Sequence, residues 1–357
     1  MLITNFMRQN PNWEELLSNP PYSLKIRRKD NLILFNYSQI ESDPSNEIVK
    51  EARGAIIEEG TFKPICVGFK RFYNIDESYA AKIDWNTAVA TSKEDGTLFF
   101  IYWYNNKWHI KTRSTFDAEE ASMGNVKFTN FKELFDYLVS FYPNFSYDKL
   151  NKNYVYCLEG CSDFNRIVIK YNKPCLFHLM TRDMSTLQEI DVEIGIPKPK
   201  KYKLNNEKDY REFVKNMGDN NEGIVVCDGN FNRVKIKTKK YIELHRMANN
   251  GILTTERALS IFLENEMSEF LTYFPQYKDF IYDVIDKYDV ACREIIGVNI
   301  VVEEWKRKNP SATRKDFSDW VKEHFNSYTK WAYLAYDGRL SIEGKTAKEL
   351  VKFLGLD

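Results

Sequence analysis

The feature that most constrains the fold is a change in the spacing of apolar residues near residue 243. Between residues 21 and about 242, apolar residues form short runs rich in β-branched and aromatic side chains, separated by Asn, Asp and Gly. This pattern is typical of β-strands, and runs such as NLILFNY (31–37) and RIVIKY (166–171) are predicted strands. After residue 243, apolar residues recur three and four positions apart, as in amphipathic helices. We therefore expect an α+β fold, with a domain built on antiparallel sheets over residues 1–243 and an all-α C-terminal domain over 244–357.

Helical spacing also picks out individual helices. Within the strand-rich part, we expect helices in FKELFDYLVSFY (131–142) and KDYREFVKNM (208–217). Thr254 or Thr255 would cap the first C-terminal helix. The C-terminal helices are predicted over residues 255–274, 275–296, 315–336 and 346–355.

The charge and cysteine content bound the class of protein. Fifty-one basic residues balance fifty-one acidic ones, so any phosphate binding must come from local clusters. The six cysteines are scattered, which favours free thiols in a reducing compartment over a zinc site. We find no signal-peptide pattern and no apolar segment of membrane-spanning length. We expect a monomeric, cytoplasmic protein with no membrane partner.

Charged residues stand at the ends of the predicted strands and in the turns between them. Lys93 lies in KEDG (93–96), where Asp95-Gly96 predicts a tight turn because glycine tolerates positive φ. Taken alone, this lysine is more simply a solvated residue at a hairpin tip. The other candidates are Arg53 in EARGAII, Arg71 and Tyr73 in KRFYN, Arg113 in KTRST, Glu159 in YCLEG, Glu222 in NEGIVV, and Lys235 and Lys237 in RVKIK.

This set of residue types suits the transfer of a nucleotide to a lysine. The attacking amine must be neutral, and nearby cations with partial desolvation lower its pKa. Cations balance the charge of a triphosphate, and carboxylates hold Mg²⁺ and ribose hydroxyls. Lys235 and Lys237 alternate with apolar residues, so they would share one strand face. The simpler alternatives are a lysine-rich edge strand and two solvated strand-end carboxylates, Glu159 and Glu222.

The order of these motifs makes the chain similar to the covalent nucleotidyltransferase superfamily of ATP-dependent ligases and capping enzymes. The matching stretches are KEDG (93–96), LEG (158–160), EGIVV (222–226) and VKIK (234–237). Three more stretches resemble the branch of the first, tRNA-repair type RNA ligase of T-even bacteriophage: RG (53–54), RFYN (71–74) and NRIVIKY (165–171). The resemblance covers about residues 30–243, and beyond that it rests only on a helical appendage.

The resemblance implies a role for each matched position. Lys93 would carry the covalent AMP, Glu159 would bind ribose and metal, Glu222 would bind metal, and Lys235 and Lys237 would contact the α- and β-phosphates. The positions implied in nucleotide binding are Arg53, Arg71, Tyr73, Glu94, Gly96, Arg113 and Val225, with Tyr73 and Val225 near the adenine. Arg71 and Arg113 stand where the phage enzyme type has lysines, which keeps the charge but replaces a point charge with a planar fork.

The function implied by the resemblance is ATP-dependent RNA ligation with Mg²⁺ or Mn²⁺. AMP would pass from Lys93 to the 5′-phosphate of an RNA end, and a 3′-hydroxyl would displace it. The RNA would be single-stranded or a broken tRNA loop, in the host cytoplasm if a phage encodes the protein. The alternatives are a DNA ligase or a capping guanylyltransferase, which normally carry a β-barrel where this chain is helical. A non-catalytic RNA-binding protein would be expected to have lost Lys93, Glu222 or one of the two final lysines.

Overall fold

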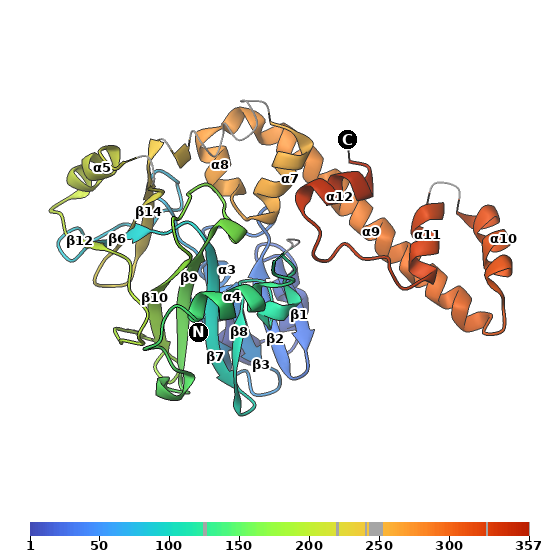
Figure 1. Ribbon diagram of the computed structural model, residues 1–357, viewed down its shortest axis with the longest axis horizontal. Helices are drawn as coiled ribbons and strands as arrows, with labels where there is room; N and C mark the ends of the chain where they lie inside the picture. Colours follow the sequence, from blue (N-terminus) through green and yellow to red (C-terminus); the bar gives the residue numbers. More distant parts are fainter. Residues whose placement is uncertain (124–126, 219–220, 240, 243–252, 326–327, 357) are drawn as a thin grey trace. The chain divides into compact units, whose positions relative to one another are not determined.

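The computed structural model describes residues 1–123, 127–218, 221–239, 241–242, 253–325 and 328–356. The chain divides into two compact units, Met1–Gly251 and Ile252–Asp357. The first carries three sheets with a few helices, and the described part of the second is helical (Figure 1). The prediction of an α+β fold followed by an all-α part is thus confirmed. The predicted boundary between residues 243 and 244 lies outside the described residues, and the roles of the two parts stay predictions.

A four-stranded antiparallel sheet comes first along the chain, in the order β1-β2-β3-β4. Leu32 and Leu34 of β2 face a core shared with the next sheet, whereas Ile33 and Phe35 face the N-terminal helices. Both faces are buried, which explains why NLILFNY is a continuous apolar run instead of an alternating one. The strands are β1 (Leu24–Lys29), β2 (Leu32–Tyr37), β3 (Arg53–Glu58) and β4 (Pro64–Cys66); the helices are α1 (Leu2–Gln9), α2 (Trp13–Ser18) and α3 (Glu47–Glu51).

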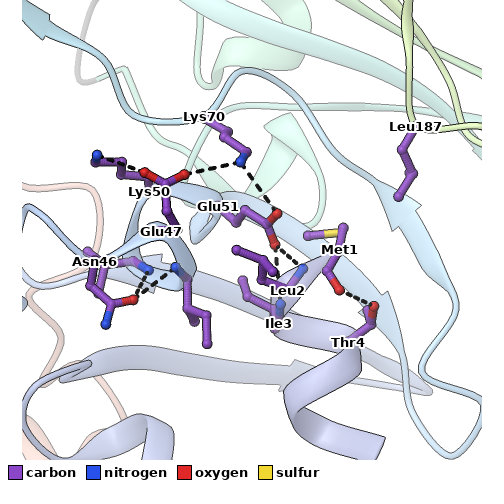
Figure 2. A network of polar contacts seen from close by, with 12 residues as sticks. Met1, Leu2, Ile3, Thr4, Asn46, Glu47, Lys50, Glu51, Lys70 and Leu187 are labelled. Carbon is purple, nitrogen blue, oxygen red and sulfur yellow. Dashed lines mark hydrogen bonds and ion pairs between the residues drawn. The ribbon is translucent and has the colours of Figure 1, made fainter. Parts of the chain in front are cut away.

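Helix α3 anchors the N-terminus, as Figure 2 shows. The Glu51 carboxylate accepts hydrogen bonds from the backbone N–H groups of Leu2 (2.8 Å) and Ile3 (3.2 Å), which lie at the start of α1. Free N–H groups at a helix start favour such an anion. Lys70 lies 3.3 Å from Glu47 and 3.8 Å from Glu51. The network therefore holds two segments of the chain in place: the one just before Arg53 and the one just before Arg71.

Two five-stranded sheets complete the first unit, in the orders β11-β10-β9-β7-β8 and β12-β6-β13-β14-β5. Neighbouring strands are antiparallel except β14 and β5. Both predicted helices of this unit are confirmed: α4 (Phe131–Val139) packs on the first sheet and α5 (Glu207–Lys215) on the second. The strands are β5 (Tyr73–Asn74), β6 (Val89–Lys93), β7 (Thr97–Tyr104), β8 (Lys107–Lys111), β9 (Tyr154–Cys161), β10 (Cys175–Asp183), β11 (Glu189–Ile190), β12 (Lys201–Tyr202), β13 (Gly223–Cys227) and β14 (Arg233–Lys237).

The second unit is helical as predicted, but the stretches 255–274 and 315–336, each predicted as one helix, both contain two helices. The Thr254 side chain caps the first of these helices by accepting from the backbone N–H of Arg257. Helix α9 continues past the predicted end at residue 296, because buried Val298 and Val302 extend its apolar face. No helix among the described residues is both long and apolar enough to span a membrane. The helices are α7 (Thr255–Leu263), α8 (Met267–Tyr273), α9 (Lys278–Lys308), α10 (Arg314–His324), α11 (Thr329–Tyr336) and α12 (Ala347–Leu354); short 3₁₀ turns span Ala118–Glu120, Tyr147–Lys149, Asp163–Asn165 and Pro275–Tyr277.

Candidate active site

Three neighbouring strands bring two lysines and a glutamate together. Gly223, the first residue of β13, pairs with Lys93 at the end of β6 and with Lys237 at the end of β14. Glu222 precedes Gly223 and therefore lies between the two lysines. Its Oε1 is 2.6 Å from Lys93 Nζ and 2.7 Å from Lys237 Nζ. We call Lys93, Glu222 and Lys237 the lysine–glutamate triad.

The triad is buried to different degrees. The side chains of Glu222 and Lys237 are 1% and 2% exposed, whereas that of Lys93 is 22% exposed. Burial alone would raise the pKa of Glu222, but the ammonium groups of Lys237 and Lys93 lower it below its usual range. Glu222 is therefore ionised at neutral pH. Its second oxygen, Oε2, is buried and has no hydrogen-bond partner, and such an orphan acceptor favours a ligand that can satisfy it.

The KEDG stretch is not the hairpin tip that the turn signal predicted. It links β6 of one sheet to β7 of the other, so Lys93 sits where the chain crosses between sheets. The buried Asp95 carboxylate holds this crossing. It accepts hydrogen bonds from the backbone N–H groups of Val168 (2.9 Å) and Ile169 (2.7 Å) and from the Tyr241 hydroxyl (3.0 Å).

Those contacts explain a second difference from the sequence prediction. The run RIVIKY (166–171) has the length and apolar content of a strand, yet it is irregular in the structure. Its backbone donors at Val168 and Ile169 bond to Asp95 in place of a neighbouring strand. The segment therefore holds the KEDG stretch (93–96), which we call the lysine turn, through hydrogen bonds to Asp95. Its apolar residue Ile169 is buried.

Gly96 is required for a reason other than the predicted one. Its φ lies outside the left-handed region. A Cβ at this position would instead lie 2.2 Å from the carbonyl oxygen of Gly160 and 2.8 Å from Cys161 Sγ. The neighbouring Glu94 carboxylate accepts from the Ser92 hydroxyl (2.6 Å) and the Tyr171 hydroxyl (3.2 Å). In the structure, both positions shape the lysine turn, and their predicted contact with a nucleotide remains a prediction.

Glu159 lies on β9, within electrostatic reach of the triad. Although part of its side chain reaches the surface, burial raises the pKa of its carboxyl to about 8, and the Lys93 charge limits the rise. The structure thus places a largely neutral carboxyl and an ionised one, Glu222, in the same region. Among the described residues, no three His, Cys, Asp or Glu side chains gather as a metal site. A divalent ion held by these two carboxyls would complete its shell with water and phosphate oxygens.

Four further cations surround Tyr37, a residue that the sequence analysis did not single out. The guanidinium carbons of Arg71 and Arg113 lie 4.2 and 5.5 Å from the Tyr37 ring centre, and Arg113 Nη1 donates to the Tyr37 hydroxyl at 3.2 Å. Burial would raise the pKa of Tyr37, but Arg113, Arg71, Arg53 and Lys235 together lower it. We call these four residues the cation cluster; β14 carries both Lys235 of this cluster and Lys237 of the triad.

The cation cluster contains buried donors that lack a partner. Nη1 of Arg53 and Nη1 of Arg71 are both buried without a hydrogen bond. Arg53 and Lys235 lie 6.0 and 5.9 Å from the ring centre of Phe72. Convergent guanidinium groups with unsatisfied N–H donors suit a phosphate, which accepts several charge-assisted hydrogen bonds.

The two residues predicted near an adenine lie in the same sheet, on the strands that flank β14: Tyr73 on β5 and Val225 on β13. Tyr73 is 3% exposed, its hydroxyl donates to the Pro44 carbonyl at 2.8 Å, and Arg71 covers its ring at 4.9 Å. Val225 is half-buried on β13, opposite Lys235 of β14. Neither position is tested by a bound ligand, and the adenine contact remains a prediction.

A fully buried lysine, Lys111, holds the backbone next to two residues of the cation cluster. Lys111 Nζ donates to the carbonyl oxygens of Gly54 (2.9 Å) and Arg113 (3.4 Å), and burial lowers its pKa to about 8. Gly54 has a φ of +75°, and a Cβ there would lie 2.3 Å from the Arg113 carbonyl oxygen. Lys111 therefore ties together the backbones that carry Arg53 and Arg113. In KWHIK (107–111), alternation places Lys111 and Ile110 on opposite faces of the strand. That pattern does not predict that Lys111 is buried.

Comparison with known proteins places the chain in a family. The sequence pattern of the RNA ligase family matches residues 51–241, which is more than half of the chain, and the chain belongs to this family. The match includes every residue of the triad and the cation cluster, whereas Tyr37 lies outside it.

Individual relatives are moderately similar. A protein of Autographa californica nuclear polyhedrosis virus, named as a bifunctional polynucleotide kinase/RNA ligase, is 27% identical over 322 residues, 85% of this chain and 46% of that protein. An RNA ligase of Rhodothermus phage RM378 is 25% identical over 316 residues, 72% of this chain and 69% of that protein. The chain thus spans about half the length of the viral relative. Among solved structures, an archaeal ATP-dependent RNA ligase is 12% identical with a TM-score of 0.45, covering 99% of this chain and 82% of that one.

Proposed function

We propose that the protein is an ATP-dependent RNA ligase that joins 5′-phosphate and 3′-hydroxyl RNA ends through AMP bound covalently to Lys93. The observation that carries the proposal is the lysine–glutamate triad, in which a partly exposed lysine and a buried one share a single carboxylate oxygen. Membership of the RNA ligase family supports the reaction class. The names of the viral and phage relatives support RNA as the substrate.

In the first step, Lys93 Nζ would attack the α-phosphorus of ATP. The Lys93 ammonium would first give a proton to water, the N–P bond would then form, and the bond to pyrophosphate would break. Because Glu222 Oε1 holds both Lys93 and Lys237, it positions the nucleophile beside a second cation that can contact the α-phosphate. The ion pair must loosen before attack, since only the free amine is nucleophilic.

A divalent ion, Mg²⁺ or Mn²⁺, fits the carboxyls of this site. The unpartnered Oε2 of Glu222 and the Glu159 carboxyl are the residues that would hold it. When bound, the ion would neutralise charge on the phosphates. The raised pKa keeps much of the Glu159 carboxyl neutral near pH 7. Glu159 must therefore lose a proton when it binds the ion, since a metal ligand must be deprotonated.

The cation cluster would bind the phosphates that leave as pyrophosphate. Arg53 and Arg71 offer buried, unpartnered donors, and Arg113 adds a third guanidinium beside Tyr37. Planar forks make paired hydrogen bonds to phosphate oxygens. Arginine at positions 71 and 113 is therefore compatible with the role that lysine has in the T-even phage type.

The later steps extend the proposal to RNA repair. AMP would pass to a 5′-phosphate, and a 3′-hydroxyl would displace it, as in the tRNA-repair ligase of T-even phages. The first unit would serve as the adenylyltransferase and the helical unit would recognise RNA such as a broken tRNA loop. We place the reaction in the host cytoplasm, carried out by a monomer.

The test is an end-joining assay on labelled RNA. We expect sealing only of RNA with a 5′-phosphate and a 3′-hydroxyl, with adenylylated RNA as a transient species, and weaker sealing of matching DNA. Lys93→Ala should fail on this RNA with ATP yet still seal RNA that is already adenylylated, because the lysine is needed only for the first step. Sealing of unactivated RNA by Lys93→Ala would contradict the proposal, as would a preference for DNA ends.

A further inference from the structure

Two cysteines face each other on neighbouring strands next to the lysine turn. Cys161 ends β9, Cys175 begins β10, and they are direct partners in the antiparallel register. Such partners have Cα atoms about 4.5–5.5 Å apart, which is inside the range that a disulfide spans. Both cysteines are free. The pair could therefore be bridged with little backbone movement.

The sulfur of Cys161 also touches the turn that carries Lys93. It packs against Gly96, where a Cβ would lie only 2.8 Å away. It is also close enough to Tyr171 to raise the pKa of that hydroxyl, and the hydroxyl accepts from the Asp95 backbone N–H at 2.8 Å and donates to Glu94 at 3.2 Å. A displacement of this sulfur is therefore transmitted to three consecutive residues after Lys93.

We propose that Cys161 and Cys175 form a reversible disulfide that suppresses adenylylation of Lys93, with a small-molecule disulfide such as glutathione disulfide as the oxidant. The effect on adenylylation rests on the proposed function, whereas formation of the bond does not. Cys175 is half-buried and Cys161 is fully buried, so Cys175 reacts first. The neighbouring Cys161 lowers the pKa of Cys175, which favours the reactive thiolate at Cys175.

The chemistry balances as two thiol–disulfide exchanges. The Cys175 thiolate attacks one sulfur of glutathione disulfide, which releases one glutathione thiolate and leaves a mixed disulfide. The Cys161 thiolate then attacks the Cys175 sulfur and releases the second glutathione. Two protein thiols are oxidised, one glutathione disulfide is reduced to two thiols, and the two thiol protons pass to the released glutathione. Excess dithiol reductant reverses both exchanges.

The consequence follows from bond length. A disulfide holds its sulfurs about 2.05 Å apart, far closer than two unbonded sulfur atoms can approach. Formation of the bond therefore draws Cys161 Sγ toward Cys175 and away from its packing against Gly96. A displacement of about 1 Å near a nucleophile costs up to about 100-fold in rate, so we expect a fall of about 10- to 100-fold in Lys93 adenylylation.

The remaining cysteines provide internal controls. Cys66 and Cys157 are 0% exposed in the core between two sheets. Cys227 lies on β13, and its partners on the neighbouring strands are Val89 of β6 and Arg233 of β14, so neither partner is a cysteine. Cys292 lies on α9 in the helical unit. A mild oxidant should therefore consume two thiols in the pair before it affects the others.

The experiment treats the full chain with glutathione disulfide, blocks remaining thiols, and maps non-reduced peptides alongside the rate of adenylylation from ATP. We expect a Cys161–Cys175 linked peptide and a rate loss that reductant restores. Cys175→Ser should keep the reduced rate and resist the oxidant, while the matched control Cys292→Ser should remain sensitive.

Two results would overturn the proposal. One is the lack of a Cys161–Cys175 peptide under excess oxidant, and the other is a linked protein that adenylylates at the reduced rate. If even the reduced protein does not adenylylate, the proposed function fails, and the peptide map still decides whether the disulfide exists.

Discussion

Replacement of Glu222 by Gln tests the energetics of the lysine–glutamate triad. The substitution keeps the shape of the side chain but removes the charge that Lys93 and Lys237 share at 2.6 and 2.7 Å. Lys237 is almost fully buried, so its ammonium depends on protein groups for solvation. Removing one partner of a buried ion pair costs about 3–5 kcal/mol. At about 2–4 °C per kcal/mol for a unit of this size, we expect the midpoint of thermal unfolding to fall by roughly 6–20 °C.

The measurement is a double-mutant cycle with Glu222→Gln, Lys237→Met and the double variant, followed by denaturant and thermal unfolding. The double variant should be less destabilised than the sum of the single variants, because an apolar replacement of a buried pair is often close to neutral. The matched control is Asp136→Asn. This residue also pairs with a lysine, Lys132, at 2.6 Å, but it is 53% exposed, so its loss should cost less than about 1 kcal/mol.

Two results would refute the reasoning. Additivity within about 0.5 kcal/mol would show that Glu222 and Lys237 are not coupled. The pH dependence is a second check. Because the folded pKa of Glu222 is lowered, the stability contributed by the pair is present above about pH 4.3 and is lost as the pH falls through the folded value. A difference between wild type and Glu222→Gln that persists at the lowest pH would contradict the assignment.

Three other substitutions test separate parts of the site. Lys111→Met should lower stability by about 1–3 kcal/mol and raise the KM for ATP about tenfold, because the Gly54 carbonyl loses its buried donor; an unchanged KM would contradict this. Gly96→Ala should slow Lys93 adenylylation by about 100-fold, since its Cβ would lie 2.2 Å from a backbone oxygen; a normal rate would show that the turn tolerates movement. Because the pKa of Glu159 is raised to about 8, the Mg²⁺ concentration for half-maximal adenylylation should fall as the pH rises toward 8 and then level off, and Glu159→Gln should lose this dependence.

The fold class was predictable because hydrophobic period is a local property of the sequence. The strands containing Lys93, Glu159 and the VKIK lysines were recognisable from apolar runs that end in a charged residue. Their pairing was not, because register depends on contacts between distant segments. The sequence predicted the residues of the triad, and only the register of β6, β13 and β14 shows that Gly223 sets Glu222 between two lysines.

The errors have physical causes of the same kind. RIVIKY has the composition of a strand, but the Asp95 carboxylate takes its backbone donors, and a side chain so distant in sequence leaves no local signal. Tyr37 ends an apolar strand and reads as a core residue. Its role beside Arg71 and Arg113 arises only when the loops before β5 and after β8 come close to β2.

The central claim is tested most directly by locating the covalent nucleotide. Full-length protein is incubated with α-labelled ATP and Mg²⁺, digested, and the labelled peptide sequenced, with Lys93→Ala and α-labelled GTP in parallel. We expect label from ATP on the peptide that contains Lys93, and none in the variant. Label on another lysine, label from GTP in preference to ATP, or no label in a preparation shown to be free of bound AMP would contradict the account.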